Sequence, residues 1–228
     1  MNRLSLFTLL VLVYLGLSKS FSPSERSTPY LVNEQVFSSF FLGAPLSVIL
    51  TDRLQTGFMI KTYFLELRLV QGFKLPETIL VRTSKGFWEK NKTNLGMSLF
   101  RRDEKDGSSS VVAQPPGAIF LGDPSYGNWE LAPSGEREWH FYNAYKYFPD
   151  YLGWGDYRPT ETFTRELKLH LTNAETYYGD QNQFGTTGTV TSKVFKAREY
   201  KMIDTDVDFK SHMKKFFKLK TSSSEGAP

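Results

Sequence analysis

The 228-residue chain contains no cysteine. Disulfide bonds, thiol nucleophiles and cysteine metal ligands are therefore excluded. A chain of this length can bury a hydrophobic core without covalent cross-links. Because many exported proteins of animals use disulfides freely, an exported chain without cysteine favours a bacterial periplasm or cell surface.

Histidine is scarce, with only His140, His170 and His212 in the chain. A zinc site needs histidines one helical turn apart, or close to carboxylate ligands, and here the nearest two are thirty residues apart. His170 is the better candidate for a polar role, because Glu166 precedes it by one helical turn. We expect no metal site at these residues.

Catalytic and cofactor-binding motifs are also missing. The chain has no Gly-x-Ser-x-Gly turn for a serine nucleophile and no glycine-rich phosphate loop ending in lysine. Asp204, Asp206 and Asp208 alternate like the start of a calcium loop, but Phe209 and Lys215 occupy the positions of its glycine and glutamate. We therefore predict no catalytic residue, no metal and no cofactor.

The one long hydrophobic run lies at the N-terminus. Arg3 precedes the apolar stretch 4–17, and Ser18-Lys19-Ser20 places small residues before a cut ahead of Phe21. This is the layout of a secretory signal peptide, so residues 1–20 are predicted to be a leader. An uncleaved anchor is the alternative, although the run is shorter than the about 20 residues a spanning helix needs. We expect export to a periplasm or cell surface.

The rest of the chain divides into three parts. Residues 21–29 form a polar lead-in, 30–205 a single domain, and 206–228 a basic, partly disordered tail. The net charge of +4 falls to +2 once the leader is removed, which gives no general case for nucleic acid binding. Membrane contact is expected only through the tail, where basic and aromatic residues alternate: Lys214, Lys215, Phe216, Phe217 and Lys218.

Alternation of apolar and polar residues predicts a sheet. In the stretch 59–70, Leu65 and Leu67 share one side, while Glu66 and Arg68 share the other, so one face is expected to be buried and one exposed. Further strands are expected at 46–50, 78–83, 95–100, 111–113 and 118–121, with a polar hairpin turn over 101–110.

Two helices are predicted in the second half of the domain. The first runs from a Ser134 cap to Pro149, and the second from Thr160 to Asn173. The resulting fold is a single α+β domain with a mostly antiparallel, sandwich-like sheet. Both helices are expected to pack on one face or end of that sheet.

Large aromatic residues are the clearest excess in composition, and they concentrate between residues 117 and 159. The loop 148–159 is bounded by two prolines, so we expect it to be ordered. Trp154 lies between two glycines and is predicted either to be presented to a partner or to fold back into the core. The predicted partner-binding residues are Trp129, Tyr151, Trp154, Tyr157 and Arg158.

These features predict an exported, non-catalytic protein that acts by contact. Its partners would be other envelope or filament proteins in a periplasmic or surface assembly of the filament or sheath type. The alternative is a secreted glycan- or peptidoglycan-binding protein or hydrolase. Its carboxylates would come from Asp123, Asp156 or Glu166.

Overall fold

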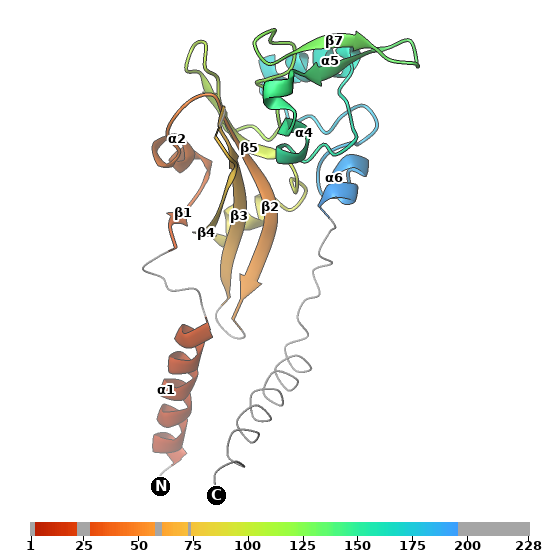
Figure 1. Cartoon of the computed structure of the whole chain (residues 1–228). Helices are drawn as coiled ribbons and strands as arrows, with labels where there is room; N and C mark the ends of the chain where they lie inside the picture. Colours follow the sequence, from red (N-terminus) through yellow and green to blue (C-terminus); the bar gives the residue numbers. More distant parts are fainter. Residues whose placement is uncertain (1–2, 22–27, 58–60, 73, 196–228) are drawn as a thin grey trace, which may run out of the picture. The chain divides into compact units, whose positions relative to one another are not determined.

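The computed structural model describes residues 3–21, 28–57, 61–72 and 74–195 (Figure 1). Contacts divide the chain into Met1–Lys196 and Ala197–Pro228, and every described residue belongs to the first unit. The predicted tail contacts, His212 and the three alternating aspartates lie outside the described residues. The described part has mixed α and β structure, as predicted.

A six-stranded sheet with strand order β1-β4-β3-β2-β5-β6 carries the first half of the domain. β1 pairs with β4 in parallel, and every other pair in this sheet is antiparallel. The prediction of a mostly antiparallel sheet is therefore confirmed. The strands are β1 (Tyr30–Leu31), β2 (Leu46–Thr56), β3 (Thr62–Val70), β4 (Glu77–Thr83), β5 (Ser98–Arg102) and β6 (Ser109–Ser110).

β3 follows the predicted alternation on one side only. Leu65 and Leu67 are completely buried, as expected. Glu66 and Arg68 are half-buried rather than exposed, because later segments of the chain cover part of the second face. Arg68 Nη1 donates to the Tyr151 carbonyl over 3.3 Å and thus ties β3 to the second half of the domain.

A hairpin joins β5 and β6, as predicted, but β6 lies inside the predicted turn 101–110 and the strand expected at 111–113 is wrong. The turn of the hairpin contains Gly107 at φ +66°, a backbone conformation that suits glycine. The expected strand at 118–121 is wrong: the chain forms successive turns there, and Phe120 N donates to Gly117 O over 2.9 Å.

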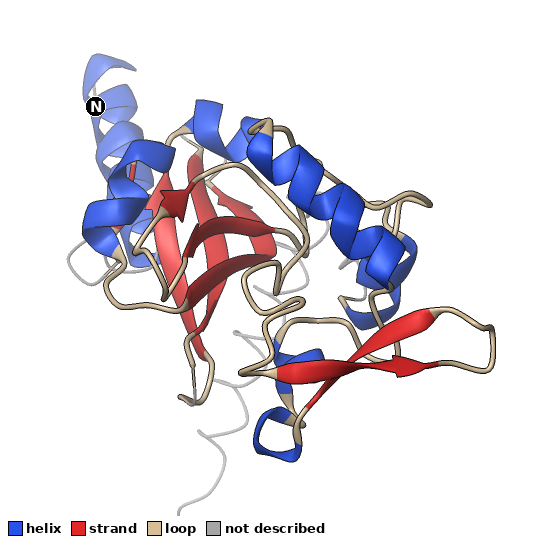
Figure 2. Ribbon diagram, turned by 90° about the horizontal axis from the view of Figure 1, so that it is seen from above, coloured by secondary structure: helices blue, strands red, loops and turns tan. Residues whose placement is uncertain are grey.

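The first predicted helix is also wrong. β7 (Gly127–Leu131) and β8 (Arg137–Phe141) form an antiparallel hairpin instead. Trp139 and Phe141 alternate with Glu138 and His140, a pattern that also fits a strand, and cross-strand pairing decided between the two. Trp129 lies opposite Trp139, with ring centroids 5.1 Å apart in an edge-to-face arrangement. Figure 2 shows this hairpin as a ribbon separate from the larger sheet.

The second predicted helix is confirmed as α5 (Glu161–Thr172). Thr160 caps it by accepting a hydrogen bond from Phe163 N over 3.2 Å, and Asn173 ends it. Phe163 and Leu167 are buried on its inner face. Shorter elements were not predicted: η1 (Glu34–Val36), α2 (Phe37–Phe40), α3 (Lys85–Lys90), η2 (Asn143–Tyr145), α4 (Phe148–Tyr151) and α6 (Thr189–Val194).

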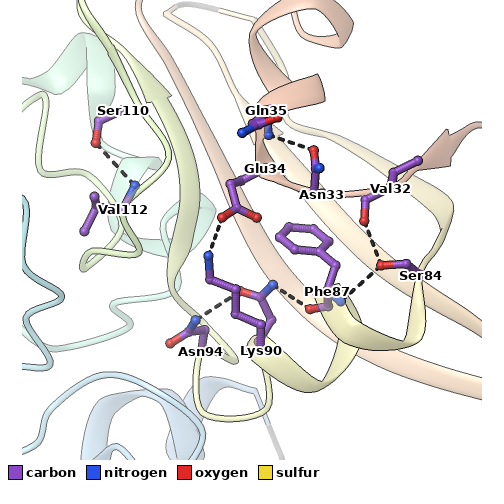
Figure 3. A network of polar contacts seen from close by, with 11 residues as sticks. Val32, Asn33, Glu34, Gln35, Ser84, Phe87, Lys90, Asn94, Ser110 and Val112 are labelled. Atoms are coloured by element: carbon purple, nitrogen blue, oxygen red, sulfur yellow. Dashed lines mark hydrogen bonds and ion pairs between the residues drawn. The ribbon is translucent and has the colours of Figure 1, made fainter.

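A polar network attaches α3 to the segment that follows β1 (Figure 3). Ser84 Oγ accepts from Phe87 N over 3.1 Å and donates to Val32 O over 2.7 Å. Lys90 at the other end of α3 forms an ion pair with Glu34. Both ends of this short helix are therefore held by side chains.

The segment predicted to be a leader forms α1 (Arg3–Phe21). Within the described residues, no helix has both the length and the hydropathy required to cross a membrane.

Candidate contact site

The loop between the hairpin and α5 is ordered, as predicted, and α4 forms its first part. Trp154 N donates to Pro149 O over 2.7 Å, which folds the chain back on itself directly after α4. Gly153 and Gly155 have φ values of +73° and +57°, a region that side chains disfavour. The glycines therefore make the reversal around Trp154 feasible.

The structure contradicts a partner-binding role for Trp154. Its side chain is 1% exposed, and the indole stacks on Phe141 with ring centroids 5.4 Å apart. Gly117 leaves the space for this ring, since a Cβ at that position would lie 2.7 Å from it. Burying about 200 Å² of aromatic surface is more favourable in free energy than exposing the ring to solvent.

Tyr157 and Arg158 chiefly support the loop. The Tyr157 ring packs edge-to-face against Phe163 and Phe184, and burial, together with nearby Asp180, raises the pKa of its hydroxyl. Arg158 Nη1 donates to Gly155 O over 2.7 Å. Both side chains remain half-buried, so parts of them still face solvent.

Trp129 lies on β7, away from this loop in the sequence. It is half-buried because one side of the indole covers Trp139. Leu131, at the end of the same strand, is 75% exposed.

Tyr151 is half-buried and lies beside a different surface, which its neighbour Tyr147 exposes. Its ring stacks on Tyr147 with centroids 6.2 Å apart and planes 27° apart. Tyr147 is 54% exposed, and Lys146 Nζ lies 5.0 Å from its ring centroid, within cation–π range. We call Lys146, Tyr147 and Tyr151 the tyrosine surface.

The tyrosine surface is held in place by a buried side chain and by a hydrogen bond from the large sheet. Phe148, between the two tyrosines in sequence, is 3% exposed and packs edge-to-face on Phe120 and Phe141. Arg68 of β3 donates to the Tyr151 carbonyl, and burial lowers the pKa of this guanidinium. The surface is thus built on the core and the large sheet.

Sequence reasoning did not select Tyr147 or Lys146 as site residues. A helix predicted over 134–148 placed Tyr147 near its end with no defined face. The available signal was Pro149, which favours the first turn of a helix and here begins α4. That helix buries Phe148 and turns its two flanking tyrosines outward.

The histidines do not form a catalytic or metal site in the described part of the chain. His170 Nδ1 lies 3.2 Å from Glu175, and its ring stacks on Tyr177 at 4.8 Å. The expected pairing with Glu166 is wrong, because Glu166 instead lies 3.5 Å from Arg165 Nε. Among residues 3–195, apart from the gaps given above, no three acidic or histidine side chains are grouped as metal ligands.

Asp123, one of the carboxylates of the hydrolase alternative, forms local polar contacts. Asp123 accepts from Ser125 N and forms a 2.9 Å ion pair with Lys105. Burial opposes ionisation of Asp123, but these two partners outweigh it and hold its pKa below the usual range. A glycosidase general acid needs the opposite, a raised pKa.

Comparison with known proteins yields no relationship: no protein-family model, curated protein or solved structure matches the chain.

Proposed function

We propose that this protein is an exported, non-catalytic component that acts by contact with other proteins in a cell-envelope, periplasmic or surface assembly of the filament or sheath type. The observation that carries the proposal is the tyrosine surface. It combines the exposed ring of Tyr147, stacked on the half-buried Tyr151, with an adjacent cation and a backbone held by the core.

Exposed tyrosines on a rigid base suit a binding surface for two physical reasons. Aromatic side chains contribute large contact areas and are enriched among the residues that dominate binding energy. A side chain that is already stacked loses little conformational entropy on binding. Tyr147 and Tyr151 meet both conditions, and the half-buried Trp129, Tyr157 and Arg158 are proposed as its periphery.

The proposal also covers the cellular location of the protein and the roles of its N-terminal and C-terminal segments. Residues 1–20 act as a cleaved leader, and the mature protein begins at or near Phe21 in a periplasm or at a surface. The basic tail adds a salt-sensitive contact with an acidic partner or an anionic membrane surface. We also infer that the sheets and helices form a sandwich-like arrangement, with helices packed at one face or end.

A glycan ligand is the second candidate, and the stacked pair Tyr147 and Tyr151 favours it to the same extent. Sugar rings pack on exposed aromatic faces through their apolar side.

The variant Tyr147→Ala tests the contact function. We expect its folding to be normal. Its affinity for an envelope partner should fall by about thirtyfold, equivalent to about 2 kcal/mol, and its crosslinking to that partner in native cells should fall with it. Tyr30→Ala is the matched control, because Tyr30 is 47% exposed on β1 and is not part of the tyrosine surface. Equal crosslinking by both variants and the wild type would exclude the tyrosine surface from the function.

Two further measurements separate the remaining claims. Co-sedimentation with purified peptidoglycan that depends on Tyr147 would favour the glycan alternative over a protein partner. N-terminal sequencing of the protein from its native host should return a start near Phe21, whereas recovery of Met1 would contradict cleavage.

A further inference from the structure

A pocket of about 450 Å³ lies between the β5–β6 hairpin and the second half of α5, away from the tyrosine surface. Three structural units contribute to its wall: the hairpin, the turns around Gly122, and α5. Its main polar lining residues are Arg101, Lys105, Ser108, Ser109, Ser110, Asp123, Lys168 and Thr172. Asp103 also lines it.

Arg101 is the unusual member of this lining. Its side chain is only 8% exposed, and its Nη1 donates to the Val112 carbonyl over 3.0 Å. Among the described residues, no carboxylate lies within ion-pair distance of this guanidinium. Burial lowers the pKa of Arg101 to about 10, so the group still carries its charge at neutral pH. A buried charge of this kind is costly unless an opposite charge compensates it.

Two carboxylates also line the pocket, and one of them forms an ion pair with a third cation, Lys105. Asp123 pairs with Lys105 at 2.9 Å, and the Asp103 carboxylate accepts from the Lys105 backbone N–H over 2.8 Å. Lys168 of α5 has no carboxylate at ion-pair distance among the described residues, and its Nζ would lie 3.3 Å from a Cβ at Gly122. The lining therefore holds three cations, Arg101, Lys105 and Lys168, against two carboxylates, Asp103 and Asp123, which leaves a net charge of +1.

Hydroxyl groups complete one wall. Ser110 is the cross-strand partner of Arg101, and its Oγ accepts from Val112 N over 3.3 Å, leaving its hydroxyl hydrogen to donate (Figure 3). Ser108 and Ser109 precede it along the hairpin and line the same space. A guanidinium beside several hydroxyls offers many donors from one direction.

We propose that this pocket binds a phosphoryl group, with Arg101 as its buried anchor and Lys168 at its rim. A carboxylate has two oxygens, which a guanidinium alone can engage, whereas a phosphoryl group has three oxygens and close to two negative charges. The net positive lining, the buried guanidinium and the serine hydroxyls match the larger demand. The pocket volume also exceeds that of a bare ion and falls within the range of small-molecule sites. This inference is independent of the proposed contact function.

The test is a titration of the full-length protein with inorganic phosphate and, separately, with glucose 1-phosphate, followed by the backbone amide NMR signals of residues 108–110. We expect saturable shifts with both ligands. Tighter binding of glucose 1-phosphate would identify a phosphorylated small molecule as the ligand class, and equal binding would identify phosphate itself. Glucose and acetate at the same ionic strength are expected to leave these signals in place.

Variants assign the binding to named residues. Arg101→Lys keeps the charge but removes the guanidinium fork, and Lys168→Gln removes the rim charge. Each should weaken phosphate binding by about tenfold or more. Lys92→Gln is the control, because Lys92 is an exposed lysine outside the pocket lining.

Lys168 keeps the test decisive if the buried Arg101 variant does not fold, because Lys168 is exposed on α5. The proposal is overturned if phosphate causes no saturable shift, or if acetate causes the same shift. Unchanged phosphate affinity in Lys168→Gln together with unchanged affinity in any folded Arg101 variant would overturn it as well.

Discussion

The indole Nε1 of Trp154 donates a hydrogen bond to the Pro116 carbonyl over 3.0 Å. This bond joins the turn after α4 to a segment thirty-eight residues earlier in the chain. It also satisfies a polar group that is buried together with the ring, whose side chain is 1% exposed. Trp154 thus holds the support beneath the tyrosine surface while remaining unavailable to a partner.

Substitution of Trp154 should reduce stability. Trp154→Ala removes a buried ring and should cost about 3–5 kcal/mol of unfolding free energy. Trp154→Phe keeps an aromatic ring but leaves the Pro116 carbonyl without its donor, at a cost of about 1–3 kcal/mol. Chemical denaturation measures both, with Tyr147→Ala as an exposed aromatic control that should stay within about 0.5 kcal/mol. Equal midpoints for all three variants would contradict the burial of Trp154.

Two glycine substitutions should have opposite effects. A Cβ at Gly127 in β7 would lie 2.2 Å from the backbone oxygen of His140, so Gly127→Ala must displace the paired strand and should destabilise by about 1–3 kcal/mol. Gly86 lies in α3 with no atom within 4 Å of a new Cβ. Gly86→Ala should therefore stabilise by about 0.5–1 kcal/mol, because alanine is the better helix former. Thermal melts of the two variants check the sign of each effect.

Leu67 of β3 is completely buried in the large sheet. Leu67→Ala should cost about 2–5 kcal/mol, since it deletes core volume that the neighbours cannot fully refill. Glu77 begins the neighbouring strand β4 and is exposed, so Glu77→Ala should change stability by no more than about 0.5 kcal/mol. Denaturant melts in which both variants lose the same stability would show that Leu67 is not a core residue.

Asp123 should make stability depend on pH in the acid range. Its folded-state pKa is held below the usual value, so its contribution is fully present above about pH 4, the pKa of an unfolded aspartate. That contribution is lost as the pH falls through the lower folded-state pKa, because the unfolded chain then binds the proton more readily.

Stability curves of wild type and Asp123→Asn should therefore converge as the pH is lowered. Lys105→Gln, which removes the partner of Asp123, should shift the wild-type profile partway toward that of Asp123→Asn. A constant difference between wild type and Asp123→Asn down to strongly acidic pH would show that Asp123 has no depressed pKa.

The local sequence pattern was sufficient to predict secondary structure where the residues fitted only one periodicity, that of a strand or that of a helix. In β3, Leu65 and Leu67 alternate with charged neighbours, and a helix would place those charges in the apolar stripe. In α5, Thr160 supplies the cap and apolar residues recur once per turn, which excludes a strand. Both elements were predicted with nearly the correct bounds.

The local sequence pattern failed to predict secondary structure where the residues fitted both the helix and the strand periodicity. The stretch around Trp139 is aromatic on every side, so it satisfied a helical face and a strand face alike. Pairing with Trp129, ten residues earlier, selected the strand, and this pairing is a contact across the hairpin. Tyr147 was not selected for the same reason, since its exposure follows from where α4 lies, whereas Tyr151 was already among the predicted contact residues.

The sequence by itself determined the absence of thiol chemistry, the sheet-forming alternation of β3, the bounds of α5 and the order of the loop around Trp154. The tertiary structure alone decided that Trp154 is buried, that Tyr147 is exposed, and that Arg101 lines a pocket without a carboxylate at ion-pair distance among the described residues. The physical reason is that propensity and periodicity act between near neighbours. Burial and charge compensation depend on groups such as Pro116 and Lys168, which only the folded chain brings within reach.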